Sequence, residues 1–364
     1  MKAIRSLVLI ASFLIVMLPL NAQLKDIGTL MAGGPKDAQL LLQNYLKPFG
    51  NALGANLSAG WYSTAKSHNL LGFDITLTTS VAFVPEADRM FDASRLALTN
   101  SGNVAAHVSG TSSPTFAGKK EAGQEITYTY TYNSNSYEIA KYKTPQGTGL
   151  TFLPSPMLKV GFGLIKGTEL MGRYVPKVGL GKFGDFGLWG VGIKHELKQY
   201  IPVLSRVPVL NISLMGGYTK MNSGANLSFT PDDLGVTVSN PPSPDTWKNQ
   251  RMDLGVSNWT VNLLVSADLP IIAVYGGAGV SSSKTALKLK GNYPIPSLNE
   301  TTAQVEVNPM ADPIDISIEG KDGGITKPRL NAGFKLKLGL LHINFDYIYA
   351  NYSVATAGFG ISFR

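Results

Sequence analysis

The stretch PRLNAGFKLKLGLLHINFDYIY, residues 328–349, decides the fold class because its hydrophobicity alternates residue by residue. The apolar face of its first half carries Leu330, Ala332, Phe334, Leu336 and Leu338, and the other face carries Arg329, Asn331, Gly333, Lys335 and Lys337. After Gly339 and Leu340 the parity changes, and the second half opposes apolar residues to His342, Asn344 and Asp346. Alternation with this period is typical of β-strands with one apolar face. The stretch therefore predicts a β-hairpin with a two-residue turn.

The same alternation recurs along the chain. The predicted strands cover residues 54–65, 70–84, 125–133, 157–165, 168–177, 186–197, 207–219, 256–267, 271–281, 327–338, 342–350 and 356–364. Most have about the 9–11 residues of a tilted membrane-spanning strand. Their second face mixes Gly, Ser and Thr with scattered charges, whereas a soluble β-sandwich, the main alternative, exposes a densely charged face.

These strands predict an all-β fold, a transmembrane antiparallel β-barrel of about 12–14 strands. The barrel is expected to span residues 54–364, with an irregular insertion around residues 85–122. Aromatic residues near strand ends are expected to lie at the membrane interfaces and so support the barrel. They are Trp61, Tyr174, Trp189, Tyr218, Trp259 and Tyr349. Long connections are expected outside the cell and short turns in the periplasm.

The first 22 residues predict a cleavable signal peptide. Lys2 and Arg5 precede an apolar run that ends in the small residues Asn21 and Ala22. We therefore expect export, insertion into lipid by the barrel-insertion machinery, and location in the cell outer membrane of a Gram-negative bacterium.

Residues 23–53 are expected to form an N-terminal helical segment. Apolar residues recur within it at the spacing of one helix face, namely Leu41, Leu42, Tyr45, Leu46 and Phe49. This apolar stripe needs an apolar partner, either at the barrel rim or inside the lumen. The sequence leaves both positions open, so the helix is a possible plug.

Strand parity predicts which polar side chains line the lumen. These are Asp74, Lys159, Glu169, Arg173, Lys194, Glu196, Arg329, Lys335, Lys337, His342, Asn344 and Asp346. Opposite charges among them can pair across strands. The surplus of Lys and Arg favours an anionic or amphipathic anionic solute.

Several classes of function are disfavoured by the composition. The chain has no Cys, and its four His are not at metal-ligand spacing, so we expect neither a metal nor a cofactor. The mild and dispersed positive charge gives no reason to expect nucleic acid as a partner. The stripe of His342, Asn344 and Asp346 is interpreted as pore lining, because no nucleophile motif accompanies it, and an enzyme is not expected.

Three longer runs carry a family resemblance: GLIKGTELMGRYVP at residues 163–176, LWGVGIKHELKQYIPVLSRVPVLNISLMGGYT at residues 188–219, and residues 331–364. They resemble an uncharacterised family of Gram-negative outer-membrane β-barrels. The helix-first layout more distantly resembles the long-chain fatty-acid transporter barrels, and this resemblance implies a hatch in the lumen and sideways release of apolar ligands.

The resulting hypothesis is passive uptake of a hydrophobic or amphipathic small molecule. The alternatives are a porin for small anions and a structural or secretion-associated barrel that binds a protein partner through its long loops. Gly276, Gly277 and Gly279 mark either a lateral exit or close packing of a plug against the wall.

Overall fold

The structure of the protein is a computed structural model. It describes residues 28–179, 184–234, 242–299, 301–302, 304–319 and 327–363. The predicted signal peptide at residues 1–22 lies outside the described residues.

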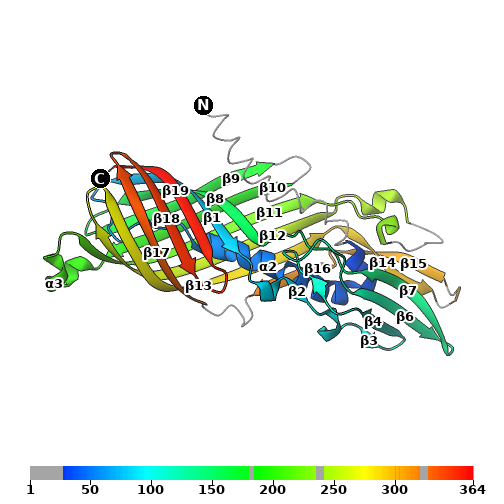
Figure 1. Cartoon of the computed structure of the whole chain (residues 1–364). Coiled ribbons are helices and arrows are strands. Elements are labelled where there is room, and N and C mark those ends of the chain that lie inside the picture. The colour runs from blue at the N-terminus through cyan, green and yellow to red at the C-terminus, as the bar shows by residue number, and fades with distance from the viewer. Residues whose placement is uncertain are drawn as a thin grey trace.

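Ten antiparallel strands form a closed barrel (Figure 1). In chain order they are β1 (Phe73–Phe83), β8 (Phe152–Gly163), β9 (Thr168–Gly179), β10 (Asp185–Glu196), β11 (Leu210–Asn226), β12 (Arg251–Asp268), β13 (Ile272–Lys290), β17 (Lys327–Leu338), β18 (Leu341–Tyr349) and β19 (Val354–Phe363). The first and last strands close the barrel, because β1 pairs with β19 from Phe73 opposite Phe363 onward. The predicted transmembrane-type β-barrel fold is therefore confirmed.

The predicted hairpin of β17 and β18 is confirmed as well. Two residues separate the end of β17 at Leu338 from the start of β18 at Leu341, and these two leucines pair across the turn. Gly339 has a φ of 69°, a left-handed conformation that the tight turn requires and that glycine adopts at little cost.

The strand count is ten rather than the expected 12–14, because two predicted strands are not part of the wall. Residues 54–58 continue a helix, since Leu53 and Leu57 extend the helical spacing of the preceding apolar stripe. Residues 125–132 form a strand, but its inward side chains Ile126 and Tyr128 pack within a separate sheet. Alternation alone does not distinguish a strand that faces lipid from one that covers another domain.

The two ends of the barrel differ. The short-turn end carries the turns at residues 166–167 and 339–340 and a short connection with η5 (Lys198–Tyr200) and α3 (Pro202–Ser205). The long-loop end carries additional structure, which we call the loop domain. It includes η2 (Glu86–Asp88), β2 (Met90–Phe91), η3 (Ala93–Arg95), β3 (Asn100–Ser101), β4 (Val104–Ser109), β5 (Ser113–Pro114), β6 (Glu125–Tyr132), β7 (Asn135–Lys143), η6 (Pro231–Leu234), η7 (Pro244–Trp247), β14 (Asn292–Asn299), β15 (Gln304–Ala311) and β16 (Ile314–Glu319).

The loop domain contains a four-stranded sheet in the order β3, β4, β6 and β7 and a hairpin of β14 and β15. Strand β16 pairs with the end of β13 beyond the point where β17 begins. The region of residues 85–122, expected to be irregular, thus contains short strands and helical turns.

The N-terminal segment runs from the loop domain into the barrel. The turn η1 (Leu30–Gly33) is followed by α2 (Pro35–Ser58), which contacts β1, β8, β11, β12 and β13. These strands stand on different sides of the closed sheet, so the helix lies inside the lumen (Figure 1).

None of the helices in the described part of the chain is long and apolar enough to cross a membrane.

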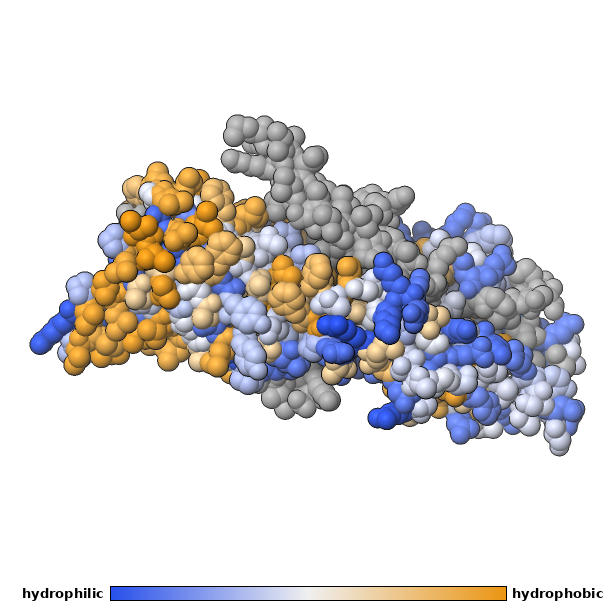
Figure 2. Space-filling view, in the orientation of Figure 1, coloured by the Kyte–Doolittle hydropathy of each residue, from blue (hydrophilic) through white to orange (hydrophobic). Residues whose placement is uncertain are grey.

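An apolar belt covers the outward face of the barrel. Figure 2 shows hydrophobic side chains gathered over the half that carries β17, β18 and β19, whereas the loop domain is largely hydrophilic. The belt includes Phe334, Phe345 and Ile361, which are all exposed. Such a belt on a closed β-barrel is the architecture of Gram-negative outer-membrane proteins.

The belt makes a prediction about charge. Phe334→Arg should destabilise the barrel in lipid vesicles by roughly 2–4 kcal/mol, because it places a charge on the lipid-facing side. The matched control is Met310→Arg in β15. Met310 is about as exposed as Phe334, at 41% against 38%, but it lies in the loop domain and not in the belt. Guanidinium unfolding of both variants measures the difference. Equal losses of stability would contradict the membrane placement.

Candidate functional site

The outer end of α2 is anchored in the loop domain. The buried carboxylate of Asp37 accepts hydrogen bonds from the Thr99 backbone N–H (2.8 Å) and from the Tyr128 hydroxyl (2.9 Å). Burial raises the pKa of the Tyr128 hydroxyl well above its usual range, which keeps it a donor to this carboxylate. The helix is thus tied to a sheet outside the barrel.

The five predicted plug residues, Leu41, Leu42, Tyr45, Leu46 and Phe49, are all buried. Phe49 packs against Phe116 with ring centroids 4.7 Å apart, and the Tyr45 hydroxyl donates to the Gln146 carbonyl at 2.9 Å. The apolar stripe therefore faces loop-domain residues as well as the barrel wall. The deeper half of the helix, around Gly50 and Gly54, lies against β13.

Two arginines from different strands hold the inner end of α2. Arg173 of β9 donates to the carbonyl oxygen of Leu57 (2.9 Å) and to that of Ala59, and Arg329 of β17 donates to that of Ser58 (2.9 Å). These carbonyls lack partners within the helix, and the negative end of the helix dipole attracts cations. Arg173 is 2% exposed and Arg329 is 3% exposed. Within the described residues, no carboxylate lies at ion-pair distance from either guanidinium.

Trp61 continues the filling of the lumen. Its ring stacks under the Arg173 guanidinium, whose carbon lies 3.8 Å from the ring centroid. A Cβ atom at Gly192 or Gly217 would lie within 3 Å of this ring, so glycine is required in the wall there. The expectation that Trp61 marks a membrane interface is therefore wrong, because the side chain is buried inside the barrel.

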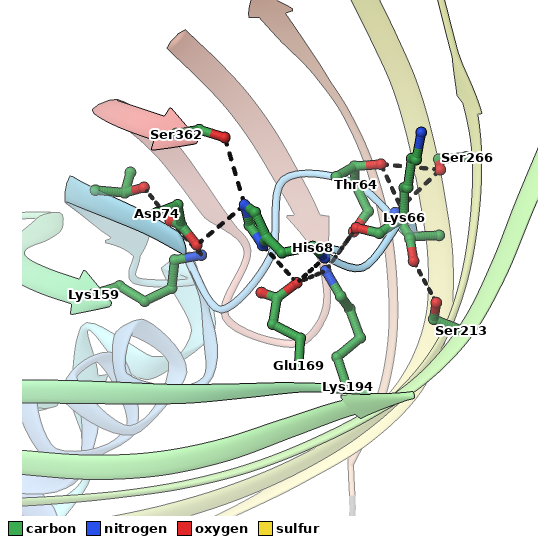
Figure 3. A network of polar contacts seen from close by, with 12 residues as sticks. Thr64, Lys66, His68, Asp74, Lys159, Glu169, Lys194, Ser213, Ser266 and Ser362 are labelled. Carbon is green, nitrogen blue, oxygen red and sulfur yellow. Dashed lines mark hydrogen bonds and ion pairs between the residues drawn. The ribbon is translucent and has the colours of Figure 1, made fainter. Parts of the chain in front are cut away.

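A network of buried ionic groups closes the short-turn end (Figure 3). Lys159 pairs with Asp74 at 3.1 Å, and Lys194 pairs with Glu169 at 3.0 Å. His68 lies between the two pairs, with its Nδ1 atom 2.9 Å from Glu169. Lys194 also donates to the carbonyl oxygen of Lys66 at 3.1 Å, which fixes the segment that leaves the lumen. Paired in this way, the charges form a closed structural network.

The network contains groups that resemble a metal site and a catalytic triad. His68, Asp74 and Glu169 offer ligand atoms within 4.8 Å of one another, but a lysine neutralises each carboxylate. The Ser362 hydroxyl lies 3.5 Å from Nε2 of His68, and Asp74 lies 4.0 Å from the same nitrogen. A carboxylate at that point would repel a developing oxyanion. The arrangement therefore favours closure of the lumen over chemistry.

The remaining predicted lumen residues lie on the inner face or at the rim. Asn331 donates to Asp346 at 2.8 Å, His342 Nε2 lies 3.1 Å from the Thr76 hydroxyl, and Lys337 pairs with Asp268 at 3.1 Å. Buried within the barrel are Lys335, His342, Asn344 and Asp346, whereas Glu196 and Lys337 are half-buried near the short-turn end. Strand parity did not identify Tyr62, Thr64 or His68 as lumen residues. The strand predicted at residues 54–65 is wrong, because residues 59–65, like His68, lie in a segment with no regular structure.

The barrel wall is incomplete between β8 and β9. These strands pair only from Lys159 opposite Arg173 to Gly163 opposite Glu169. Beyond Lys159, strand β8 stays paired with β1 to its start at Phe152, while β9 stays paired with β10 through a bulge. No ladder pair in the described residues joins residues 152–158 to residues 174–179, and we call this stretch the seam.

Three prolines explain the seam. The N–H of Gly163 donates to the carbonyl oxygen of Gly72 at 2.8 Å, so odd-numbered N–H groups of β8 point to β1. The N–H of Leu164 donates to the carbonyl oxygen of Thr168 at 2.7 Å, so even-numbered groups of both strands point to each other. Prolines occupy three of the positions whose N–H would face the seam, namely Pro154, Pro156 and Pro176. Since proline has no N–H, neither edge can continue the ladder.

An apolar crevice lies behind the seam. It has a volume of about 30 Å³, and its lining includes Leu53 and Leu57 of α2, Pro154 and Met157 of β8, and Leu188 and Leu254 of β10 and β12. Met157 connects it to a charge, because the Sδ atom lies 3.7 Å from Nη1 of Arg173. The crevice is thus apolar, and the Arg173 guanidinium lies beyond it on the far side of Met157.

The glycine cluster in β13 does not open the wall. Strand β13 pairs with β12 and with β17 through Gly276, Gly277 and Gly279. A Cβ atom at Gly277 would lie 2.7 Å from Leu264, so close packing explains this glycine.

Comparison with known proteins gives a family but no activity. A family model described as a family of unknown function, DUF6588, matches residues 1–363, and the chain belongs to this family. No curated protein matches the sequence.

Solved structures of outer-membrane proteins show only weak likeness. The attachment invasion locus protein Ail of Yersinia pestis is 10% identical, with a TM-score of 0.25 over 80% of this chain and 99% of that chain. The monoaromatic hydrocarbon channel TodX is 12% identical, with a TM-score of 0.25 over 81% and 67%. The translocator domain of the autotransporter NalP from Neisseria meningitidis is 11% identical, with a TM-score of 0.25 over 80% and 87%. Such TM-scores carry no argument about function or about the predicted resemblance to fatty-acid transporters.

The arginine contacts predict the behaviour of α2. Arg173→Met and Arg329→Met each leave buried helix carbonyls without donors, at a cost of about 1–3 kcal/mol per group. Amides in the last turn of α2 should then exchange with deuterium at least tenfold faster in the reconstituted protein. Arg206→Met, at an exposed residue after α3, is the control. Unchanged exchange in both lumen variants would show that the arginines do not hold the helix.

Proposed function

We propose that this protein is an outer-membrane barrel that moves a hydrophobic or amphipathic small molecule sideways between the crevice and the membrane through the seam. The single observation that carries the proposal is the apolar crevice behind a stretch of wall that cannot form its hydrogen bonds. A water-filled pore along the axis fits less well, because α2 and residues 59–68 occupy the lumen and ionic pairs close its short-turn end.

The position of the seam supports delivery into the membrane. Tyr174 and Trp189 pair across β9 and β10, and both are exposed on the outward face, where aromatic residues mark membrane interfaces. The seam begins beside Tyr174 and continues toward the long-loop end. A molecule that leaves the crevice there meets the interface of one leaflet rather than bulk water.

The lining of the crevice indicates the class of molecule. An apolar body suits a hydrocarbon chain or ring. The Arg173 guanidinium lies behind Met157 and donates to the end of α2, so it would meet an anionic group of an amphipathic molecule only when α2 moves. The volume of about 30 Å³ corresponds to a closed form. Binding therefore requires α2 or the edges of the seam to move apart.

Restoring the missing donors tests the proposal. The variant Pro154→Val/Pro156→Val/Pro176→Val should extend the β8–β9 ladder and raise the free energy of unfolding by about 1.5–4.5 kcal/mol, since each of three new hydrogen bonds contributes about 0.5–1.5 kcal/mol. Uptake of pyrene, an apolar fluorescent probe, by cells that express the variant should fall several-fold. Hydrogen exchange at residues 154, 156 and 176 checks that the seam has closed.

Pro328→Val in β17 is the matched control, because this proline lies outside the seam and pairs with Val280 of β13. It should leave pyrene uptake unchanged. A triple variant whose seam is protected from exchange but which takes up pyrene at the wild-type rate would exclude the seam as the path.

A further inference from the structure

The strongest unassigned feature is a basic groove on the outward face of β9–β13, near the long-loop end. It has a volume of about 480 Å³ and is lined by five basic and two acidic side chains. The basic members are Lys177, Lys220, Arg251, Lys284 and Lys288. Small residues, including Gly255, Ser257 and Ala286, form its floor.

Strand register places the groove directly beyond the aromatic edge of the apolar belt. Tyr218 pairs with Trp259 across β11 and β12. One step further along the same outward face, Lys220 pairs with Ser257, and Ser257 pairs with Lys284. Trp189 lies directly opposite Lys220 on β10. The lysines therefore stand where the apolar belt ends.

The groove keeps a surplus of positive charge, because its lining carries five basic side chains and two carboxylates. Both carboxylates are shared between cations: Asp185 pairs with Arg251 at 2.5 Å and Lys177 at 3.5 Å, and Asp253 pairs with Arg251 at 2.6 Å and Lys290 at 2.7 Å. Lys288 pairs at 2.7 Å with Asp315, which is itself exposed. Lys220, in contrast, has no carboxylate at ion-pair distance among the residues that the structure describes. The groove therefore presents positive charge to whatever lies against the barrel at this height.

We propose that the groove binds the phosphorylated headgroup of a lipid in the leaflet at the long-loop end. Phosphate groups would meet Lys220, Lys284 and Lys288, and the acyl chains of the same lipid would descend over Tyr218 and Trp259. A free phosphate ion would use the lysines but not the neighbouring aromatic surface. Anionic membrane surfaces attract nearby basic side chains, which supports a lipid rather than a soluble anion.

The groove and the seam are independent features. The groove needs the barrel to sit in a membrane, but it needs no transport through the wall. A barrel that transports nothing would still retain the lipid.

Native mass spectrometry of the detergent-purified protein with added bisphosphorylated lipid A tests the groove. The variant Lys220→Gln/Lys284→Gln/Lys288→Gln should retain roughly tenfold less lipid A, because each basic side chain near an anionic headgroup contributes to binding. The control Lys119→Gln/Lys120→Gln/Lys143→Gln removes the same charge from exposed lysines of the loop domain and should bind as the wild type does. Circular dichroism confirms that both variants are folded.

A parallel titration with inorganic phosphate separates the two sources of phosphate. The proposal expects millimolar phosphate to leave lipid A bound. Displacement of lipid A by millimolar phosphate would overturn the proposal in favour of a free-anion site. Equal retention by the groove variant and the control variant would also overturn it.

Discussion

The hydrogen bonds from Arg173 and Arg329 to the end of α2 are the contacts on which the rest of the interior depends. Strands β9 and β17 are far apart in the chain, yet their guanidinium groups bind three successive carbonyls of one helix end. A helix that ends inside a barrel leaves several carbonyl oxygens without partners, and burying them unpaired is costly. The arginines satisfy these oxygens and are in turn stabilised by the helix dipole, and Arg173 is stabilised by the Trp61 ring as well. Below this point the chain is held by Lys194 and the His68 network, so the lumen is occupied from the loop domain to the short turns.

Because the lumen is filled, a path for a solute has to be sought in the wall rather than along the barrel axis. The β8–β9 seam arises because Pro154, Pro156 and Pro176 all lie at positions whose N–H would bridge the two strands. Prolines at the opposite parity would have broken pairing with β1 and β10 instead. Closed barrels hide their strand edges, so an unpaired stretch in one is a feature that needs a reason. The apolar crevice behind it supplies one, and Arg173 links the crevice to the plug contacts.

Much of this could be predicted from the sequence, and the failures have physical causes. Alternation located every strand of the wall, because a lipid-facing belt imposes a strict period of two. It also placed Arg173 and Arg329 on the inner face. It miscounted the strands for two reasons. The sequence EITYTYTYN alternates equally well in a sheet outside the membrane. Residues 54–58 fit both the period of two of a strand and the period of 3.6 of a helix. The seam could not be predicted from the three prolines alone, since register decides which neighbour loses a donor. The contacts of Tyr62, Thr64 and His68 come from an irregular segment, where no period indicates which way a side chain points.

The central claim is that an apolar molecule occupies the crevice behind the seam, and photo-crosslinking tests it most directly. An apolar photoactivatable probe is added to membranes that contain the protein, and the labelled peptides are identified by mass spectrometry with and without excess unlabelled pyrene. The account predicts label on the inward residues Met157 and Leu188, reduced by the competitor. Label confined to outward residues of the belt, such as Val191 and Phe334, and unaffected by the competitor would contradict it.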